Sequence, residues 1–139
     1  MKIESKDGYA VVTEFNENFP SKGIVGGDMT YLGKLQADKS IWHTVKVEPD
    51  SADPTIVNWK QEGDWCAENG DLLHWSVDTK MDQVNQKVSG RTIFNGGTGQ
   101  FKNAEGYIDL SGHPDPEDPT SRFIVEKGRG EIFNVESSM

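Results

Sequence analysis

The chain repeats one pattern from end to end: short runs of β-branched and aromatic residues, separated by clusters of Gly, Pro, Asn and Asp. Such runs are typical of β-strands, and the clusters between them are typical of turns. No segment keeps the i, i+3, i+4, i+7 apolar spacing of an amphipathic helix over several turns. The pattern predicts an all-β sandwich or barrel with little or no helix. We expect eight strands, at residues 8–15, 24–36, 41–48, 55–67, 71–78, 87–95, 104–112 and 121–134.

Three of the connections can be interpreted from their residues. Asn69-Gly70 lies between two apolar runs and is the strongest hairpin signal in the chain. Residues 112–119 contain three prolines and no large apolar side chain, which predicts an exposed connector. Residues 79–87 are the segment most compatible with a helix, but they carry only two apolar residues, so we expect a loop or a single turn there.

Length and composition limit the class of protein. A chain of 139 residues fits one domain, at residues 1–139. The chain has 14 Lys and Arg against 23 Asp and Glu, and this acidic balance argues against nucleic acid or an anionic membrane as the partner. No apolar run approaches the roughly 18 residues of a membrane helix, and the N-terminal residues do not resemble a signal peptide. We therefore expect a cytoplasmic protein, although a chain from which a signal had been removed would look the same.

A glycine-rich segment, Gly96-Gly97-Thr98-Gly99, lies between two of the expected strands. Its glycines permit a tight corner with positive φ, and the Thr98 hydroxyl can form a local hydrogen bond. Phe101 would then lie under the barrel. A phosphate-binding loop is the alternative, but no Lys-Ser or Lys-Thr follows the glycines and a strand follows in place of a helix. The segment therefore predicts a structural corner, and no cofactor is expected.

Residues 94–107, which contain this corner and the strand after it, resemble the strand–corner–strand segment of dirigent proteins and allene oxide cyclases. That superfamily of calycin-like barrels includes bacterial barrel proteins and cyclases that form spiro-rings. The resemblance implies a single eight-stranded antiparallel β-barrel and a class of apolar substrates that undergo cyclisation. It also leaves a homodimer or homotrimer open. It identifies no catalytic residue in this chain, because only the corner motif can be aligned.

The four tryptophans lie in the three central runs of the sequence, at Trp42, Trp59, Trp65 and Trp75. Aromatic side chains around a barrel interior would form an apolar pocket with a few polar groups, and we take these four as candidate ligand-binding residues. The alternative is that they fill the core or a subunit interface. Strand alternation places Trp59 and Trp65 on one face of their run, with Gln61 between them.

Several polar residues near these tryptophans could take part in chemistry. Our candidates for catalysis are Tyr31, His43, Glu62 and His74, with Arg91 as a further ligand-binding residue. Tyr31 with either histidine could polarise a carbonyl, and a buried carboxylate such as Glu62 or Asp64 could act as an acid or base. We expect no metal site, because the three histidines and the one cysteine lack the spacing of zinc ligands.

The functional hypothesis is a barrel that binds a small hydrophobic molecule in its lumen. It could be a cyclase or isomerase for a natural product or a lipid-derived substrate, since holding the reacting ends together supplies much of such a rate. A non-catalytic carrier and an assembly protein are the alternatives. An assembly protein would have a filled lumen and tryptophans on an outer face, whereas an enzyme would show a carboxylate or histidine in a deep pocket.

Overall fold

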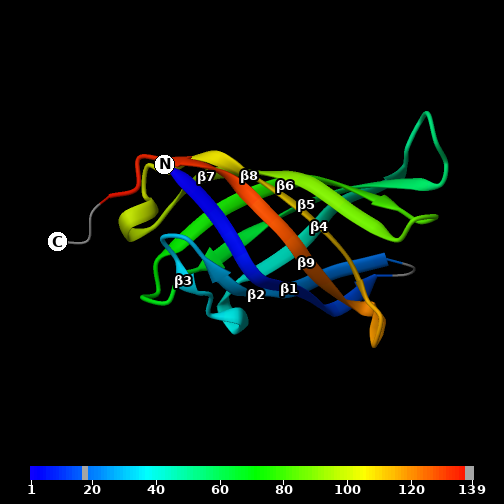
Figure 1. Cartoon of the computed structure of the whole chain (residues 1–139), viewed down its shortest axis with the longest axis horizontal. Coiled ribbons are helices and arrows are strands. Elements are labelled where there is room, and N and C mark those ends of the chain that lie inside the picture. Colours follow the sequence, from blue (N-terminus) through cyan, green and yellow to red (C-terminus); the bar gives the residue numbers. More distant parts are fainter. Residues whose placement is uncertain (17–18, 137–139) are drawn as a thin grey trace.

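The computed structural model describes residues 1–16 and 19–136, and most of them lie in β-strands (Figure 1). The only helical segments in this described part are two single turns of 3₁₀-helix, η1 (Ala37–Lys39) and η2 (Gly99–Phe101). The strands are β1 (Lys2–Asn16), β2 (Phe19–Met29), β3 (Gly33–Lys34), β4 (Ile41–Pro49), β5 (Ile56–Cys66), β6 (Leu72–Asp82), β7 (Lys87–Gly97), β8 (Glu105–Asp115) and β9 (Asp118–Phe133).

The strands form one closed antiparallel sheet. Their order is β1-β9-β8-β7-β6-β5-β4-β2, and β1 also pairs with β2, which closes the ring. The two-residue β3 pairs only with β2 and lies outside this ring. Eight strands therefore make the barrel, and the predicted fold is confirmed. A barrel of this size can be filled by side chains or can hold one small ligand.

Three expected segments differ from the structure. Residues 79–82, which we expected in a loop or a single turn, extend β6, and only 83–86 form the turn before β7. The run at 24–36 is divided by a turn at 30–32, where Tyr31 has a φ of 71°, so Tyr31 is not on a strand as we expected. Residues 112–119 are not an exposed connector, because β8 continues to Asp115 and β9 begins at Asp118. Proline is tolerated here because Pro116 falls in the two-residue turn, whereas Pro114 lies near the end of its strand.

The glycine-rich corner joins β7 to β8 through η2, as predicted. Gly96 has a φ of 78° and Gly99 a φ of 54°, values that favour glycine. The Thr98 hydroxyl accepts a hydrogen bond of 2.9 Å from the Leu72 amide, which ties the corner to the start of β6. Phe101 follows the corner and is completely buried. The corner therefore covers one end of the barrel.

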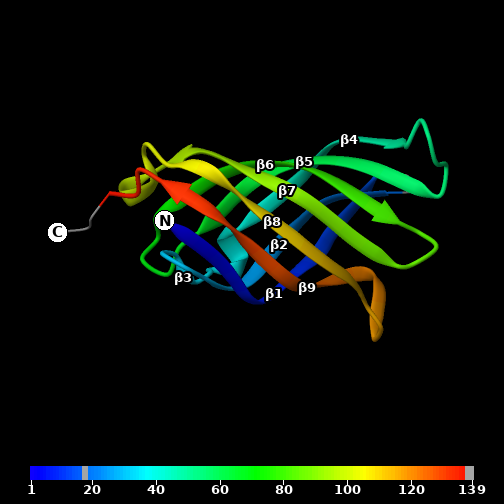
Figure 2. The same cartoon turned by 45° about the horizontal axis from the view of Figure 1, so that its top comes forward.

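The two ends of the barrel differ. The N-terminus, the end of β9, β3 and η2 lie at one end, and the turns 50–55, 83–86 and 116–117 extend from the other (Figures 1 and 2). At the first end, buried side chains of the loops and of β9 join the core and fill the interior, namely Leu32, Leu35, Phe101, Ala104 and Ile132. We call this the closed end and the other the open end.

Candidate functional site

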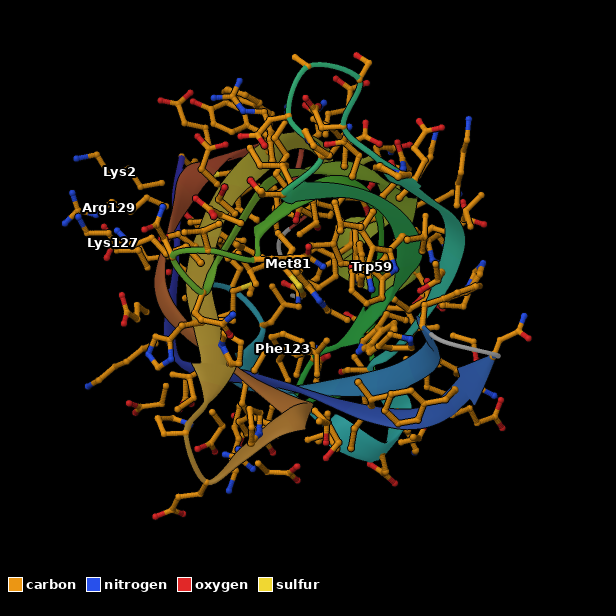
Figure 3. The ribbon with its side chains drawn as sticks, turned by 90° about the vertical axis from the view of Figure 1, so that its right-hand side faces the viewer. Lys2, Trp59, Met81, Phe123, Lys127 and Arg129 are labelled. Atoms are coloured by element: carbon orange, nitrogen blue, oxygen red, sulfur yellow. The ribbon has the colours of Figure 1, made fainter. Side chains whose placement is uncertain are left out.

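A cavity of about 150 Å³ lies inside the barrel toward the open end. Its wall is mostly apolar, and all four tryptophans of the chain contribute to it. Figure 3 looks into the barrel from the open end, with Trp59, Met81 and Phe123 inside the ring of strands. Strands on every side of the barrel contribute residues to its wall, so the cavity is part of the lumen and not a surface groove.

Strand alternation explains why the tryptophans lie inside. On β5, Trp59 and Trp65 are buried, whereas Lys60 and Glu62 between them are exposed. On β6, Trp75 and Val77 are buried in the same way. Successive side chains of a strand point to opposite faces. Residues separated by an even number of positions therefore lie on the same face, and here that face lines the lumen. The prediction that Trp59, Gln61 and Trp65 share one face agrees with their common place in the cavity wall.

Aromatic rings pack against one another in the deeper part of the lumen. The ring centroids of Trp65 and Trp75 are 5.6 Å apart, with the planes tilted by 39°. Trp65 also meets the ring of Phe94 edge-on, with the centroids 5.8 Å apart. Contacts of this geometry are favourable for aromatic side chains and hold each ring in one orientation. The inner wall of the cavity is therefore rigid and aromatic.

The indole N–H groups of the four tryptophans fall into two classes. Trp42 Nε1 donates to the Ile24 carbonyl at 3.2 Å, and Trp59 Nε1 donates to the Thr44 hydroxyl at 2.8 Å. Trp65 Nε1 and Trp75 Nε1 are buried and have no acceptor among the described residues. Buried polar groups are normally hydrogen-bonded, so two buried indole N–H groups without an acceptor are unusual.

The polar groups of the wall are amides and hydroxyls, apart from one histidine ring. Gln61, Thr79, Ser89, Thr92 and Ser111 contribute amide and hydroxyl groups, and no Asp, Glu, Lys or Arg of the described chain lines the cavity. The exception is His113, whose ring is held on both sides. Its Nδ1 lies 2.8 Å from its neighbour's carbonyl oxygen, and its Nε2 lies 2.8 Å from a carboxylate oxygen of Glu126. The wall can therefore bind and orient a molecule but offers little acid–base chemistry.

Carboxylates order two turns at the open end. Asp50 accepts hydrogen bonds from the amides of Ala52 and Asp53 and from the Asn58 side chain, at 2.9–3.1 Å. Asp82 does the same in the turn after β6, chiefly with the side chain and amide of Asn85. These hydrogen bonds, first those from the Asn58 and Asn85 side chains, hold the pKa of both carboxyls below the ordinary value. The turns beside the opening are thus fixed.

The polar candidates of the sequence lie away from this cavity. His43 Nε2 is 3.0 Å from Glu62 Oε1, and His74 pairs with Asp64, but all four side chains are about half exposed on the outside of the barrel. Arg91 makes two hydrogen bonds with Asp109 across β7 and β8, also outside. Tyr31 is exposed in its turn at the closed end. The structure brings the two His–carboxylate pairs onto adjoining strands, but it brings none of these candidates to the tryptophans.

Several cavity residues were absent from the candidates chosen from the sequence. Thr92 is 1% exposed and lines the wall, and alternation on β7 had placed it with Val88 and Phe94. Met81 and Phe123 reach the cavity near its opening. A search for reactive side chains passes over such residues because they carry no titratable group. The useful signal was the shared face of the strands, not the chemistry of single residues.

Comparison of the chain with models of protein families, with curated proteins and with solved structures gives no significant match. Among the described residues there is no group of three or more His, Cys, Asp and Glu side chains that could hold a metal ion. The same part of the chain contains no helix with the length and hydropathy needed to cross a bilayer.

Proposed function

We propose that the protein binds a small apolar molecule in the lumen of its barrel. The observation that carries this proposal is the cavity of about 150 Å³, which four tryptophans line and which faces the open end. Mostly apolar cavities accept apolar molecules, because water gains few hydrogen bonds inside them. Aromatic walls with a few placed polar groups are typical of small-molecule sites.

The cavity volume limits the size of the ligand. An engineered protein cavity of about 150 Å³ binds benzene, so one ring or a group of similar bulk is what this lumen accommodates. Drug-sized ligands occupy pockets of roughly 300–1,000 Å³. A longer molecule would have to leave part of its length outside the opening, near Met81 and Phe123. The ligand is therefore a compact molecule, or a larger one that inserts a compact end.

A cyclase or isomerase is the second candidate. It is favoured by the resemblance of residues 94–107 to dirigent proteins and allene oxide cyclases, whose substrates are natural products or lipid-derived molecules. The wall carries no carboxylate, so such a reaction would proceed through shape, desolvation and hydrogen bonding. Turnover would appear as a product that has the mass of its substrate but a different retention time. Binding without such a product would support a carrier. An assembly role has less support, because the tryptophans are buried inside the barrel.

Filling the cavity tests the binding function. Ala10 lines the cavity, and Val11, the next residue on β1, belongs to the opposite face. Ala10→Leu would occupy part of the lumen, and we expect the affinity for benzene or toluene to fall at least tenfold. Val11→Leu is the matched control and should leave the affinity within twofold. Isothermal titration or tryptophan fluorescence would measure both. Failure of the wild-type protein to bind either probe, or equal affinities of the two variants, would contradict the proposal.

A further inference from the structure

We propose that Gln61 selects the ligand, and that the ligand is a neutral molecule of about one ring with a hydroxyl group. This inference rests on the proposed binding function and specifies the chemistry of the ligand. Gln61 lies on β5 between Trp59 and Trp65, and all three side chains form part of the cavity wall. Among the described residues of this wall, Gln61 alone has an amide side chain, which presents both a donor and an acceptor.

The Gln61 amide is open to the free space of the lumen. Within the described part of the chain, the amide has no hydrogen-bond partner. The buried polar side-chain atoms that lack a partner are Asn58 Oδ1, Trp65 Nε1, Trp75 Nε1 and Arg122 Nε, and the Gln61 amide is not among them because Gln61 is only partly buried. Its side chain points inward like that of Trp59, which lies inside the ring of strands (Figure 3). The accessible surface of Gln61 therefore faces the cavity.

The two cross-strand neighbours of Gln61 do not pair with its amide. Thr44 on β4 and Val77 on β6 lie directly opposite Gln61. The Thr44 hydroxyl is already engaged, since it accepts from Trp59 Nε1 at 2.8 Å and donates to the Pro20 carbonyl at 2.7 Å. Val77 has no polar side-chain atom. A polar group in apolar surroundings is unfavourable until it finds a partner, and a ligand in the lumen is placed to supply one.

The two polar atoms of the amide indicate the chemistry of that partner. The Gln61 oxygen accepts hydrogen bonds and its nitrogen donates them. A hydroxyl group donates and accepts, so it can pair with either atom, whereas a carbonyl only accepts and leaves the Gln61 oxygen unpaired. No Lys or Arg of the described chain lines the cavity, so a carboxylate would be buried without a cation, which is strongly unfavourable. The cavity of about 150 Å³ limits the apolar part to about one ring.

Phenol and toluene test the role of Gln61, because they differ by a hydroxyl in place of a methyl group. Gln61→Met keeps the length of the side chain and removes both polar atoms. We expect this variant to weaken phenol binding about five- to tenfold, which is the usual worth of one hydrogen bond, and not to weaken toluene binding. Gln83→Met is the matched control, because Gln83 lies in the exposed turn after β6 and does not line the cavity. It should leave both affinities within twofold.

Three further probes of nearly equal size compare the oxygen groups of the ligand. We expect Gln61→Met to weaken the binding of benzyl alcohol more than that of benzaldehyde, because only the alcohol can donate to the Gln61 oxygen. Benzoate should bind wild type at least tenfold more weakly than benzyl alcohol, because its charge would be buried unpaired. Isothermal titration of each probe would measure these affinities.

A second measurement uses the wild-type protein, so it does not depend on whether a variant folds. In a crystal structure of wild type with phenol, we expect the phenol oxygen to lie about 2.5–3.2 Å from the amide oxygen or nitrogen of Gln61.

The outcomes distinguish this inference from the binding function itself. If neither toluene nor phenol binds wild type, the binding function fails. If both bind but Gln61→Met changes their affinities in parallel, or the phenol oxygen lies away from Gln61, the binding function stands and the role of Gln61 is wrong. Equal losses for benzyl alcohol and benzaldehyde would overturn the hydroxyl preference. Benzoate binding as tight as that of benzyl alcohol would overturn the requirement for a neutral ligand.

Discussion

The four tryptophans of this barrel differ in whether the indole N–H group has a hydrogen-bond acceptor. Trp42 and Trp59 are tied to the protein by hydrogen bonds to Ile24 and Thr44. Trp65 and Trp75 are buried as deeply, but they are held by ring packing alone. The first two therefore contribute to stability with both their ring and their N–H group, and the last two with their ring only.

Because of this difference, we expect Trp→Phe to lower the free energy of unfolding by different amounts at the four positions when no ligand is bound. Trp→Phe removes ring atoms at each site, which lowers the free energy of unfolding by a similar packing term. At Trp42 and Trp59 it also removes a hydrogen bond to a protein oxygen, which costs a further 1 kcal/mol or so. We expect Trp42→Phe and Trp59→Phe to be the less stable pair in urea unfolding. Equal losses for all four variants would show that the indole N–H groups of Trp65 and Trp75 are satisfied in solution.

At the scale of the strands, charged pairs on the outer face match the register of the barrel. Acidic and basic residues alternate from strand to strand along one row, which runs through Lys60, Asp78, Arg91, Asp109, Arg129 and Glu4. Opposite charges at directly paired positions stabilise a sheet, and a slip of one residue would turn them toward the lumen. The row thus favours the register that places the tryptophans inside.

The Arg91–Asp109 pair in this row predicts a pH effect. Its two hydrogen bonds, 2.8 and 2.9 Å long, hold the pKa of the Asp109 carboxyl below the ordinary value. A carboxyl with a lowered folded-state pKa contributes stability above the unfolded-state pKa of about 3.9, and this stability is lost as pH falls through the folded-state pKa. We expect wild type to be more stable than Asp109→Asn at pH 7, with the gap closing below about pH 4. Both side chains are half exposed, so 1 M salt should shrink the gap at pH 7. Urea unfolding across pH would measure it, and a constant gap would contradict this assignment.

At the scale of the whole molecule, the sequence predicted the barrel well and the site only in part. Alternation in β5 and β6 placed Trp59 with Trp65, and Trp75 with Val77, on one face of each strand, but it did not show which face lines the lumen. The pairing of β1 with β9 joins the two ends of the chain, so no local signal in the sequence indicates it. Sequence also could not show that His43 and His74 lie outside, because both faces of their strands carry bulky groups. The acceptor of an indole N–H lies on another strand. Only the structure therefore shows which of the four N–H groups have no acceptor.

The closed end of the barrel is filled by core side chains, and the cavity lies toward the open end. We therefore expect a truncation at the closed end to reduce stability more, and a truncation at the open end to reduce ligand affinity more. Phe101 is completely buried at the closed end, where it joins the core and not the cavity. Phe101→Ala should lower the free energy of unfolding by about 3–5 kcal/mol, as large truncations in a core do, while the affinity of the surviving folded fraction stays within about threefold. Met81 lines the cavity near the opening and is only partly buried. Met81→Ala should lower stability by about 1 kcal/mol, but it should lower the affinity for toluene more than Phe101→Ala does. Urea unfolding and titration of each variant test this, and an affinity loss in Phe101→Ala as large as that in Met81→Ala would mean that the two ends are not separate.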